Sequence, residues 1–127
     1  MKIRELWRDE LRIIQLMMFE QGHEVSIEQL RNAYDKAVIA KAVDDNGLQG
    51  FIMIRKLGII NELSYWHLKP EHSLLLKGLA RKLRPVGAHE PPINKERLKI
   101  LESAGFKSIG LINGLLKNSE AVILRRD

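Results

Sequence analysis

The sequence predicts a mixed α/β (α+β) fold with a central mixed sheet of six or seven strands and about four helices. Two observations predict it. Helical and strand periodicities alternate along the whole chain. In addition, residues 59–84 begin as a strand rich in β-branched and aromatic residues, pass through Pro70-Glu71, and continue as an apolar-faced helix. Such a strand-to-helix junction is where α/β proteins collect free backbone N–H groups and bind phosphate-bearing ligands.

The first half of the chain has clear start and stop signals. An amphipathic helix is expected at 8–20, with Met17, Met18 and Phe19 in the core, and Ser26 with Gln29 is a capping-box pair that opens a second helix. Asn46-Gly47 predicts a hairpin turn. The other elements are expected as strands at 2–6, 37–43, 48–55, 59–68, 86–89, 107–111 and 121–125, helices from 73 and from 94, and a last loop around Asn113-Gly114 and Asn118.

Length and composition predict one soluble, cytoplasmic domain over 1–127. The absence of cysteine excludes disulfides, a thiol nucleophile and cysteine metal ligands. No apolar run is long enough to span a membrane, and the charged start MKIRELWRDE does not fit a signal peptide. The net charge of +5 leaves two interpretations open, an anionic partner or a solvated basic surface, and its densest group is Lys77, Arg81, Lys82 and Arg84.

Two motifs give the fold a more specific interpretation. The segment NKERLKILESAGFK has Asn94 opening a helix and Gly105-Phe106 following it, and residues 68–71 read hydrophobic-x-Pro-Glu. In this order and separation they resemble the GCN5-related N-acetyltransferase (GNAT) superfamily over essentially the whole chain. The resemblance implies a GNAT-like acyl-CoA N-acyltransferase fold in which the strand at 59–68 and the strand at 86–89 are parallel neighbours.

The same resemblance implies an acetyl-CoA-dependent N-acetyltransferase whose acceptor is an amine of a small molecule or a protein. Glu62 is similar in position to the general base of the histone-modifying branch of the family, although it also fits an ordinary solvent-facing strand residue. Asn94 and Ser73 also fit helix caps. No histidine spacing fits a metal site. The implied acetyl-CoA contacts are Trp66, His67, Leu68, His72, Ser73, Leu74, Lys77, Gly78 and Asn94.

The chain departs from the family pattern in the pyrophosphate loop. Ser73 stands where the family has Arg or Gln, Leu74 and Leu76 stand where glycines are common, and Gly78 matches. Glycine lets the backbone approach a pyrophosphate closely, so a leucine side chain at such a position obstructs the ligand unless it turns into the core.

A second departure concerns the proton donor. Leu101 occupies the position of the tyrosine that serves as the acid in many family members, and Tyr34 and Tyr65 are predicted to be structural. Two other function classes therefore stay open. One is a catalytically degenerate GNAT-like binding protein, since the chain resembles compact, glycine-poor bacteriophage versions of the fold, which implies a virion-associated or host-interacting role. The other is a nucleic-acid-binding module, for which the sequence has charge but no recognised motif.

Overall fold

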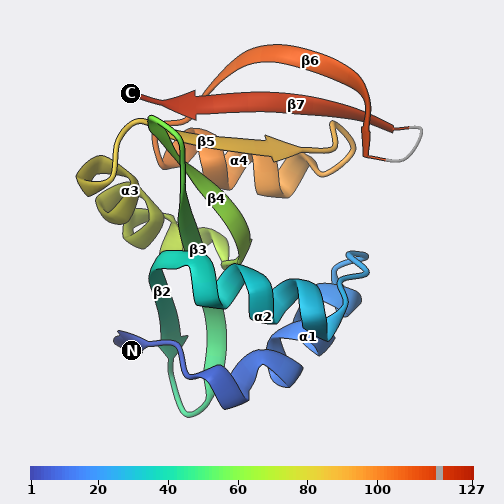
Figure 1. Cartoon of the computed structure of the whole chain (residues 1–127). Helices are drawn as coiled ribbons and strands as arrows, with labels where there is room; N and C mark the ends of the chain where they lie inside the picture. The colour runs from blue at the N-terminus through green and yellow to red at the C-terminus, as the bar shows by residue number, and fades with distance from the viewer. Residues whose placement is uncertain (117–118) are drawn as a thin grey trace. The chain divides into compact units, whose positions relative to one another are not determined.

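The computed structural model describes residues 1–116 and 119–127, and its seven strands form one mixed sheet in the order β1-β2-β3-β4-β5-β7-β6 (Figure 1). With four α-helices in the described residues, this is the predicted fold class. No helix in this part of the chain is long and apolar enough to cross a membrane. The elements are β1 (Lys2–Glu5), η1 (Arg8–Glu10), α1 (Leu11–Glu20), α2 (Ile27–Lys36), β2 (Ala37–Asp44), β3 (Leu48–Leu57), β4 (Ile60–His67), η2 (Pro70–His72), α3 (Ser73–Lys82), β5 (Val86–Glu90), α4 (Lys95–Ser103), β6 (Lys107–Leu116) and β7 (Ser119–Arg126).

Most predicted boundaries agree with these elements, but the loop predicted at Asn113-Gly114 is wrong. Both residues belong to β6, where Asn113 pairs with Glu120 of β7 in an antiparallel ladder. An Asn-Gly pair is a strong local turn signal, yet cross-strand pairing decides whether a turn forms there. The same signal gives the expected turn at Asn46 and Gly47, where φ is 56° and 125°. Asn118 lies outside the described residues.

The parallel pairing predicted between the central strand and the following strand is confirmed. Asn61 of β4 pairs with Val86 of β5, and Glu62 pairs with Gly87. Contacts along the chain divide it into two compact units, which we call the first unit (Met1–Lys56 and Leu63–Lys69) and the second unit (Leu57–Glu62 and Pro70–Asp127). The single domain over 1–127 stays a prediction.

The core of the first unit joins α1 and α2 to the strands. Helix α2 begins at the predicted capping box, in which the Gln29 backbone N–H donates to Ser26 Oγ at 3.0 Å and the Ser26 N–H donates to Gln29 Oε1 at 2.9 Å. The buried residues that form this core are Leu6, Leu11, Ile14, Met18, Leu30, Ala33, Ala42, Phe51 and Met53, with Met17 packed against them.

Phe19 corrects the predicted core of α1. Its side chain is 61% exposed, whereas Met18 is buried as expected. Helix α1 buries Leu11, Ile14 and Met18, which are spaced by three and four residues and lie on one face. Phe19 follows Met18 by one residue, about 100° around the helix, and therefore points away from that face.

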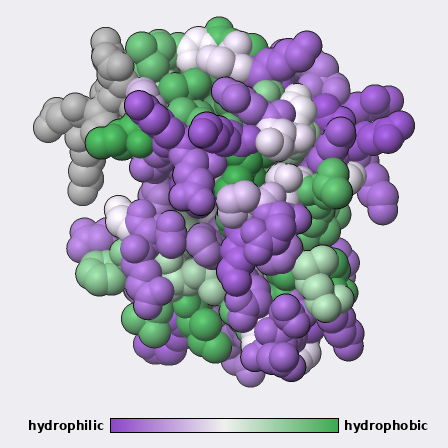
Figure 2. Space-filling view, turned by 180° about the vertical axis from the view of Figure 1, so that it is seen from behind, coloured by the Kyte–Doolittle hydropathy of each residue, from purple (hydrophilic) through white to green (hydrophobic). Residues whose placement is uncertain are grey.

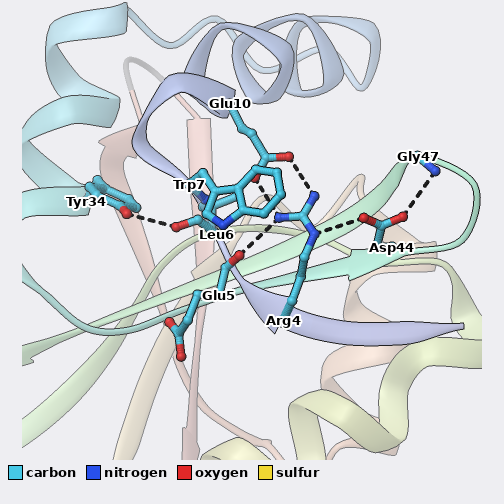
Figure 3. A network of polar contacts seen from close by, with 8 residues as sticks. All are labelled: Arg4, Glu5, Leu6, Trp7, Glu10, Tyr34, Asp44 and Gly47. Atoms are coloured by element: carbon cyan, nitrogen blue, oxygen red, sulfur yellow. Dashed lines mark hydrogen bonds and ion pairs between the residues drawn. The ribbon is translucent and has the colours of Figure 1, made fainter.

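Arg4 is the centre of a polar network between β1, η1 and the end of β2 (Figure 3). Its two terminal nitrogens bind the two Glu10 carboxylate oxygens, each at 2.8 Å, and its Nε binds Asp44 Oδ2 at 2.8 Å. The guanidinium carbon also lies 4.0 Å from the centre of the Trp7 ring. The edge of the planar guanidinium thus binds the Glu10 carboxylate with two hydrogen bonds, and its face lies over the Trp7 ring. A lysine ammonium in its place could not make both contacts.

The hydrogen bonds from Arg4 lower the pKa of both carboxylates. For Glu10 this bond is the largest cause, burial opposes it, and the Trp7 backbone N–H adds to it at 2.9 Å. For Asp44 the Arg4 bond again comes first, followed by the Gly47 N–H at 3.1 Å. The same bonds raise the pKa of Arg4. All three groups are therefore held in their charged forms in the folded state.

Gly50 of β3 lies against the end of β4. A Cβ at this position would be 2.7 Å from the carbonyl oxygen of His67 and 3.3 Å from Leu68 Cδ2. The nearest obstacle is backbone, which cannot swing aside as a long side chain can. Gly50 is therefore required for the close approach of the chain at His67 and Leu68, two of the predicted cofactor residues.

The second unit packs α3 and α4 against its strands. Helix α3 buries Leu76, Leu79 and Ala80, and α4 buries Ile100 and Leu101. Helix α4 ends as predicted at Gly105, whose φ of +96° is a left-handed conformation that favours glycine.

We predict that stability falls in acid because of the Arg4 network. The ordinary pKa values of Glu10 and Asp44 are 4.5 and 3.8, and both are lowered by folding, so the stabilisation is complete above these values and is lost as the pH falls through the folded values. Thermal unfolding followed by circular dichroism from about pH 6 to about pH 2 measures this. The acid-induced fall should be shallower in Arg4→Met than in the wild type, and parallel curves for the two proteins would contradict the assignment.

A second prediction concerns Gly50. Gly50→Ala should lower the free energy of unfolding by about 1–3 kcal/mol, since the new methyl group overlaps the His67 carbonyl oxygen. Urea denaturation measures the change. The matched control is Gly110→Ala in β6, where a Cβ meets nothing within 4 Å, so it should change stability by less than about 0.5 kcal/mol. Equal effects of the two substitutions would show that the close approach has no energetic importance.

Candidate functional site

The second unit contains the start of the strand-to-helix junction that the sequence singled out. Glu62 is the last residue of β4 in this unit, is partly buried, and pairs with Gly87 of β5. The junction then continues through η2 into α3. Six more of the predicted site residues belong to this unit, namely His72, Ser73, Leu74, Lys77, Gly78 and Asn94.

Helix α3 starts without a side-chain cap. Ser73 is its first residue and not its cap, and the N-cap position is held by His72, whose side chain makes no capping hydrogen bond. The side chain at the cap position therefore accepts no hydrogen bond from the backbone N–H groups in the first turn of α3. His72 Nδ1 is buried and has no hydrogen-bond partner among the described residues. A buried polar atom without a partner is costly, so this nitrogen is a good candidate for contact with a ligand.

The two leucines of the turn differ in orientation. Leu76 is completely buried, so it has turned into the core and does not obstruct the start of the helix. Leu74 is 74% exposed and extends into solvent. A Cβ on Gly78 would meet nothing within 4 Å, so the fold itself does not need glycine there. Both leucines stand where the family commonly has glycine, but only the Leu74 side chain is at the surface, where it could obstruct a ligand.

A basic surface follows on α3 and the turn after it. Lys77, Arg81, Lys82 and Arg84 are all exposed, and none has an ion-pair partner among the residues that the structure describes. The second unit as a whole has eleven Lys and Arg residues against seven Asp and Glu residues. Its long-range field therefore attracts anions.

Asn94 occupies the N-cap position of α4, but its side chain does not cap the helix. Instead its Nδ2 donates to Glu90 Oε1 at 2.8 Å. The same oxygen accepts from Arg97 Nε at 2.7 Å. Glu90 is only 2% exposed, and its negative charge is compensated by Arg97. A buried carboxylate competes successfully for the amide because it accepts a stronger hydrogen bond than a neutral group does.

Glu90 is a residue that the sequence interpretation missed. It ends β5, at the carboxyl end of a strand parallel to β4, which is where α/β folds collect ligand-binding groups. The available signal was an acidic residue closing a short apolar strand, with Asn and Arg four and seven residues later. Glu90 orients the Asn94 side chain and is not itself exposed to a ligand.

The three remaining predicted cofactor residues, Trp66, His67 and Leu68, lie in the first unit at the end of β4. The side chains of Trp66 and Leu68 are buried, at 3% and 4% exposure. A ligand beside this segment would therefore meet backbone groups and not these two side chains. His67 is partly buried and its carbonyl oxygen is the atom next to Gly50.

The contacts of Tyr34 and Tyr65 are those of structural residues. Tyr34 donates from its hydroxyl to the Leu6 carbonyl oxygen at 2.8 Å, as expected for a structural residue (Figure 3). Tyr65 packs against the core of the first unit. Leu101, at the position of the family's acid, is fully buried in the second unit. Neither tyrosine belongs to the unit that holds Glu62.

Comparison with solved structures identifies this architecture. Ard1 from Thermoplasma volcanium superposes with a TM-score of 0.81 at 14% identity, covering 98% of this chain and 95% of that one. A variant of the spermidine N-acetyltransferase from Vibrio cholerae gives 0.73 at 18% identity, covering 99% and 94%. NAA60 from Arabidopsis thaliana, solved in complex with acetyl-CoA, gives 0.78 at 10% identity, covering 98% and 97%. The chain has the fold of the GNAT N-acetyltransferases, and at these identities the likeness shows the fold alone.

Sequence comparison adds no relative. No family model matches the chain, and no curated protein matches it.

Proposed function

We propose that this protein is an acetyl-CoA-dependent N-acetyltransferase that acts on an amine. The observation that carries the proposal is the start of α3, where a helix N-terminus without a side-chain cap adjoins His72 Nδ1, which is buried and has no hydrogen-bond partner among the described residues. Lys77 and Arg81 follow on the same helix as exposed cations, and neither has an ion-pair partner in the part of the chain that the structure describes. N–H groups, a positive helix end and free cations are what a pyrophosphate requires, so the residues present fit this cofactor.

Each group at the junction has its own task in the proposal. The backbone N–H groups of residues 73–77 bind the pyrophosphate, and Lys77 and Arg81 neutralise its charge. His72 supplies a hydrogen bond at the cap position. The main chain at Trp66, His67 and Leu68 supplies contacts to the pantetheine arm. Acetyl-CoA itself would bring the acetyl group to be transferred, activated as a thioester.

Glu62 is the proposed general base. An amine is protonated near neutral pH and has no free lone pair, so it cannot attack a carbonyl carbon until a base removes the proton. Glu62 takes that proton, directly or through a water molecule. The partly buried position of Glu62 at the end of the parallel pair with β5 supports this assignment, since general bases are held on rigid elements beside the ligand.

The acceptor is proposed only as a class. Solved structures of the same fold include a spermidine N-acetyltransferase, a protein titled a putative phosphinothricin N-acetyltransferase, and a ribosomal-protein-S18-alanine N-acetyltransferase. The proposed acceptor is therefore an amine of a small molecule or of a protein. We infer a cytoplasmic location from the cysteine-free composition, in keeping with a reducing compartment.

A second candidate is a non-catalytic GNAT-like binding protein, virion-associated or host-interacting if the chain is phage-encoded. Two observations favour it: Leu74 is exposed where the family commonly has glycine, and the acid position is a buried leucine, Leu101. In this case the junction would bind no cofactor, and the two candidates are separated by the measurements that follow.

Acetyl-CoA should stabilise the fold. At about 100 times its Kd it should raise the free energy of unfolding by about 2.7 kcal/mol. Differential scanning fluorimetry with and without acetyl-CoA measures this. Lys77→Ala should reduce the shift, while Lys107→Ala, which removes an exposed lysine at the start of β6, should not. No shift at millimolar acetyl-CoA would favour the non-catalytic candidate.

Glu62→Gln tests the base. The substitution keeps the size of the side chain but cannot accept the proton, so the transfer rate near neutral pH should fall by roughly 10²–10⁴-fold. Acetyl transfer to a panel of amines between about pH 6 and about pH 9 measures it. The matched control is Glu102→Gln, an exposed position on α4, which should leave the rate unchanged. Equal rates for wild type and Glu62→Gln would remove Glu62 from the mechanism.

A further inference from the structure

Strand β6 (Lys107–Leu116) forms one edge of the sheet. It stands last in the strand order, and among the residues that the structure describes it pairs with β7 alone (Figure 1). At ten residues it is as long as strands usually become. Its outer side therefore presents a long row of backbone N–H and C=O groups to which another strand can bind.

The two edges of the sheet differ in how they are protected. The opposite edge, β1, has only four residues, and three of them are charged, namely Lys2, Arg4 and Glu5. Short length and charge are common protections of an edge strand against pairing with another chain. In β6 the one charged residue is Lys107, at its first position, and the sequence 108–116 has neither a charged residue nor a proline. Strand β6 thus lacks both protections.

Apolar side chains of β6 are exposed on both faces of the sheet. Ile109, Leu111 and Ile112 are 62%, 56% and 47% exposed. Leu111 and Ile112 are consecutive, so they point to opposite faces, and neither face is covered at this strand. Apolar side chains occur elsewhere among the hydrophilic residues of the surface, as Figure 2 shows for one side, so exposure alone does not mark an interface. What distinguishes these three is their place on an unpaired strand edge.

The regular part of β6 is complementary to itself about Leu111. Residues 110–113 pair with β7 in unbroken register, between two irregularities of the ladder. When two such segments lie antiparallel with Leu111 opposite itself, Gly110 of each strand lies opposite Ile112 of the other, on the same face. A Cβ on Gly110 would meet nothing within 4 Å, so there is open space beside it. An isoleucine side chain of the facing strand can occupy that space.

The single charge of β6 selects the direction of pairing. A parallel pair in register would place two Lys107 ammonium groups side by side, where they repel each other. The antiparallel pair centred on Leu111 separates them by eight residues, about 26 Å along the strands. Between them the facing residues carry no charge. An identical strand therefore meets no repulsion in this segment, whereas a charged peptide would gain no ion pair there.

We propose that β6 is a dimerisation strand, through which two copies of this chain pair antiparallel about a two-fold axis at Leu111 and form one continuous sheet. The main chains supply the ladder of hydrogen bonds, and the apolar side chains of β6 lose contact with water on both faces. Each copy uses its one β6 edge in the contact, so the assembly closes at two copies. Such a dimer forms whether or not the protein transfers acetyl groups.

Sedimentation equilibrium of the full chain measures the association. One edge strand is a small interface, so the wild type should dimerise reversibly with a Kd of about 1–100 µM. Leu111→Lys should weaken the dimer at least about tenfold, because the axis brings the two new ammonium groups together. The matched control is Ile59→Lys, which places a lysine at an isoleucine that is 98% exposed and lies between β3 and β4. It should dimerise like the wild type.

Disulfide formation tests the register, since the chain has no cysteine of its own. At the axis the Cα atoms of facing residues lie about 4.5–5.5 Å apart, within the distance of about 4.4–6.8 Å that a disulfide spans. Leu111→Cys should therefore give a covalent dimer on mild oxidation. In Ile109→Cys the two cysteines are about 13 Å apart along the strands and should not react with each other. Ile59→Cys measures the background from random collision.

Four results would overturn the inference: a wild type that stays monomeric up to about 500 µM, wild-type assemblies larger than two copies, an unchanged Kd in Leu111→Lys, or equal crosslinking of the three cysteine variants. A monomeric wild type would leave the β6 edge to a different protein. Far-ultraviolet circular dichroism checks that each variant is folded. If Leu111→Lys does not fold, the cysteine variants decide alone, since these neutral changes at exposed positions should leave the fold intact.

Discussion

The parallel pairing of β4 with β5 constrains the rest of the second unit. Antiparallel strands can be joined by a tight turn, but parallel strands need a crossover connection that returns the chain to its starting edge. Here the connection is η2 followed by α3. The start of α3 therefore follows directly after the carboxyl end of β4, and this is the arrangement in which α/β folds bind phosphate groups. Any chemistry proposed for the junction depends on this topology first and on individual side chains second.

In each unit a buried glutamate is paired with an arginine. In the first unit Arg4 binds Glu10 with two hydrogen bonds and Asp44 with a third. In the second unit Glu90 is bound by Arg97 and Asn94. Leaving a buried charge such as that of Glu10 or Glu90 without a partner is costly, and in both networks the carboxylate is paired with an arginine. The two networks fix the β1–η1 corner and the start of α4, and neither needs a ligand to do so.

Other polar groups have no partner among the described residues. Within residues 1–116 and 119–127, the buried His72 Nδ1 has no hydrogen-bond partner, and the exposed Lys77 and Arg81 have no ion-pair partner. The contrast with the satisfied networks supports a difference in role: the matched charges stabilise the fold, and the unmatched groups are the ones available to ligands of opposite charge.

The sequence by itself determined the elements whose signals are local. The Ser26–Gln29 capping box, the Asn46-Gly47 turn and the glycine end of α4 all appear where predicted, because each depends on backbone conformation and hydrogen bonds within a few residues. The resemblance in two motifs was sufficient to predict the fold, including the parallel β4–β5 pair. The candidate site residues were predicted the same way, from motif positions.

Only the tertiary structure decided how these side chains are used. Asparagine is a residue type that commonly caps helices. The Asn94 side-chain amide nevertheless donates its hydrogen bond to the buried carboxylate of Glu90, four residues earlier. The dipeptide Asn113-Gly114 is a typical turn sequence, but both residues lie in β6, where Asn113 pairs with Glu120 of β7. The exposure of Phe19, the burial of Leu76 and the need for glycine at position 50 depend on neighbours distant in sequence. Local propensities are worth a fraction of a kcal/mol to about 1 kcal/mol, and a buried charge or a cross-strand ladder outweighs them.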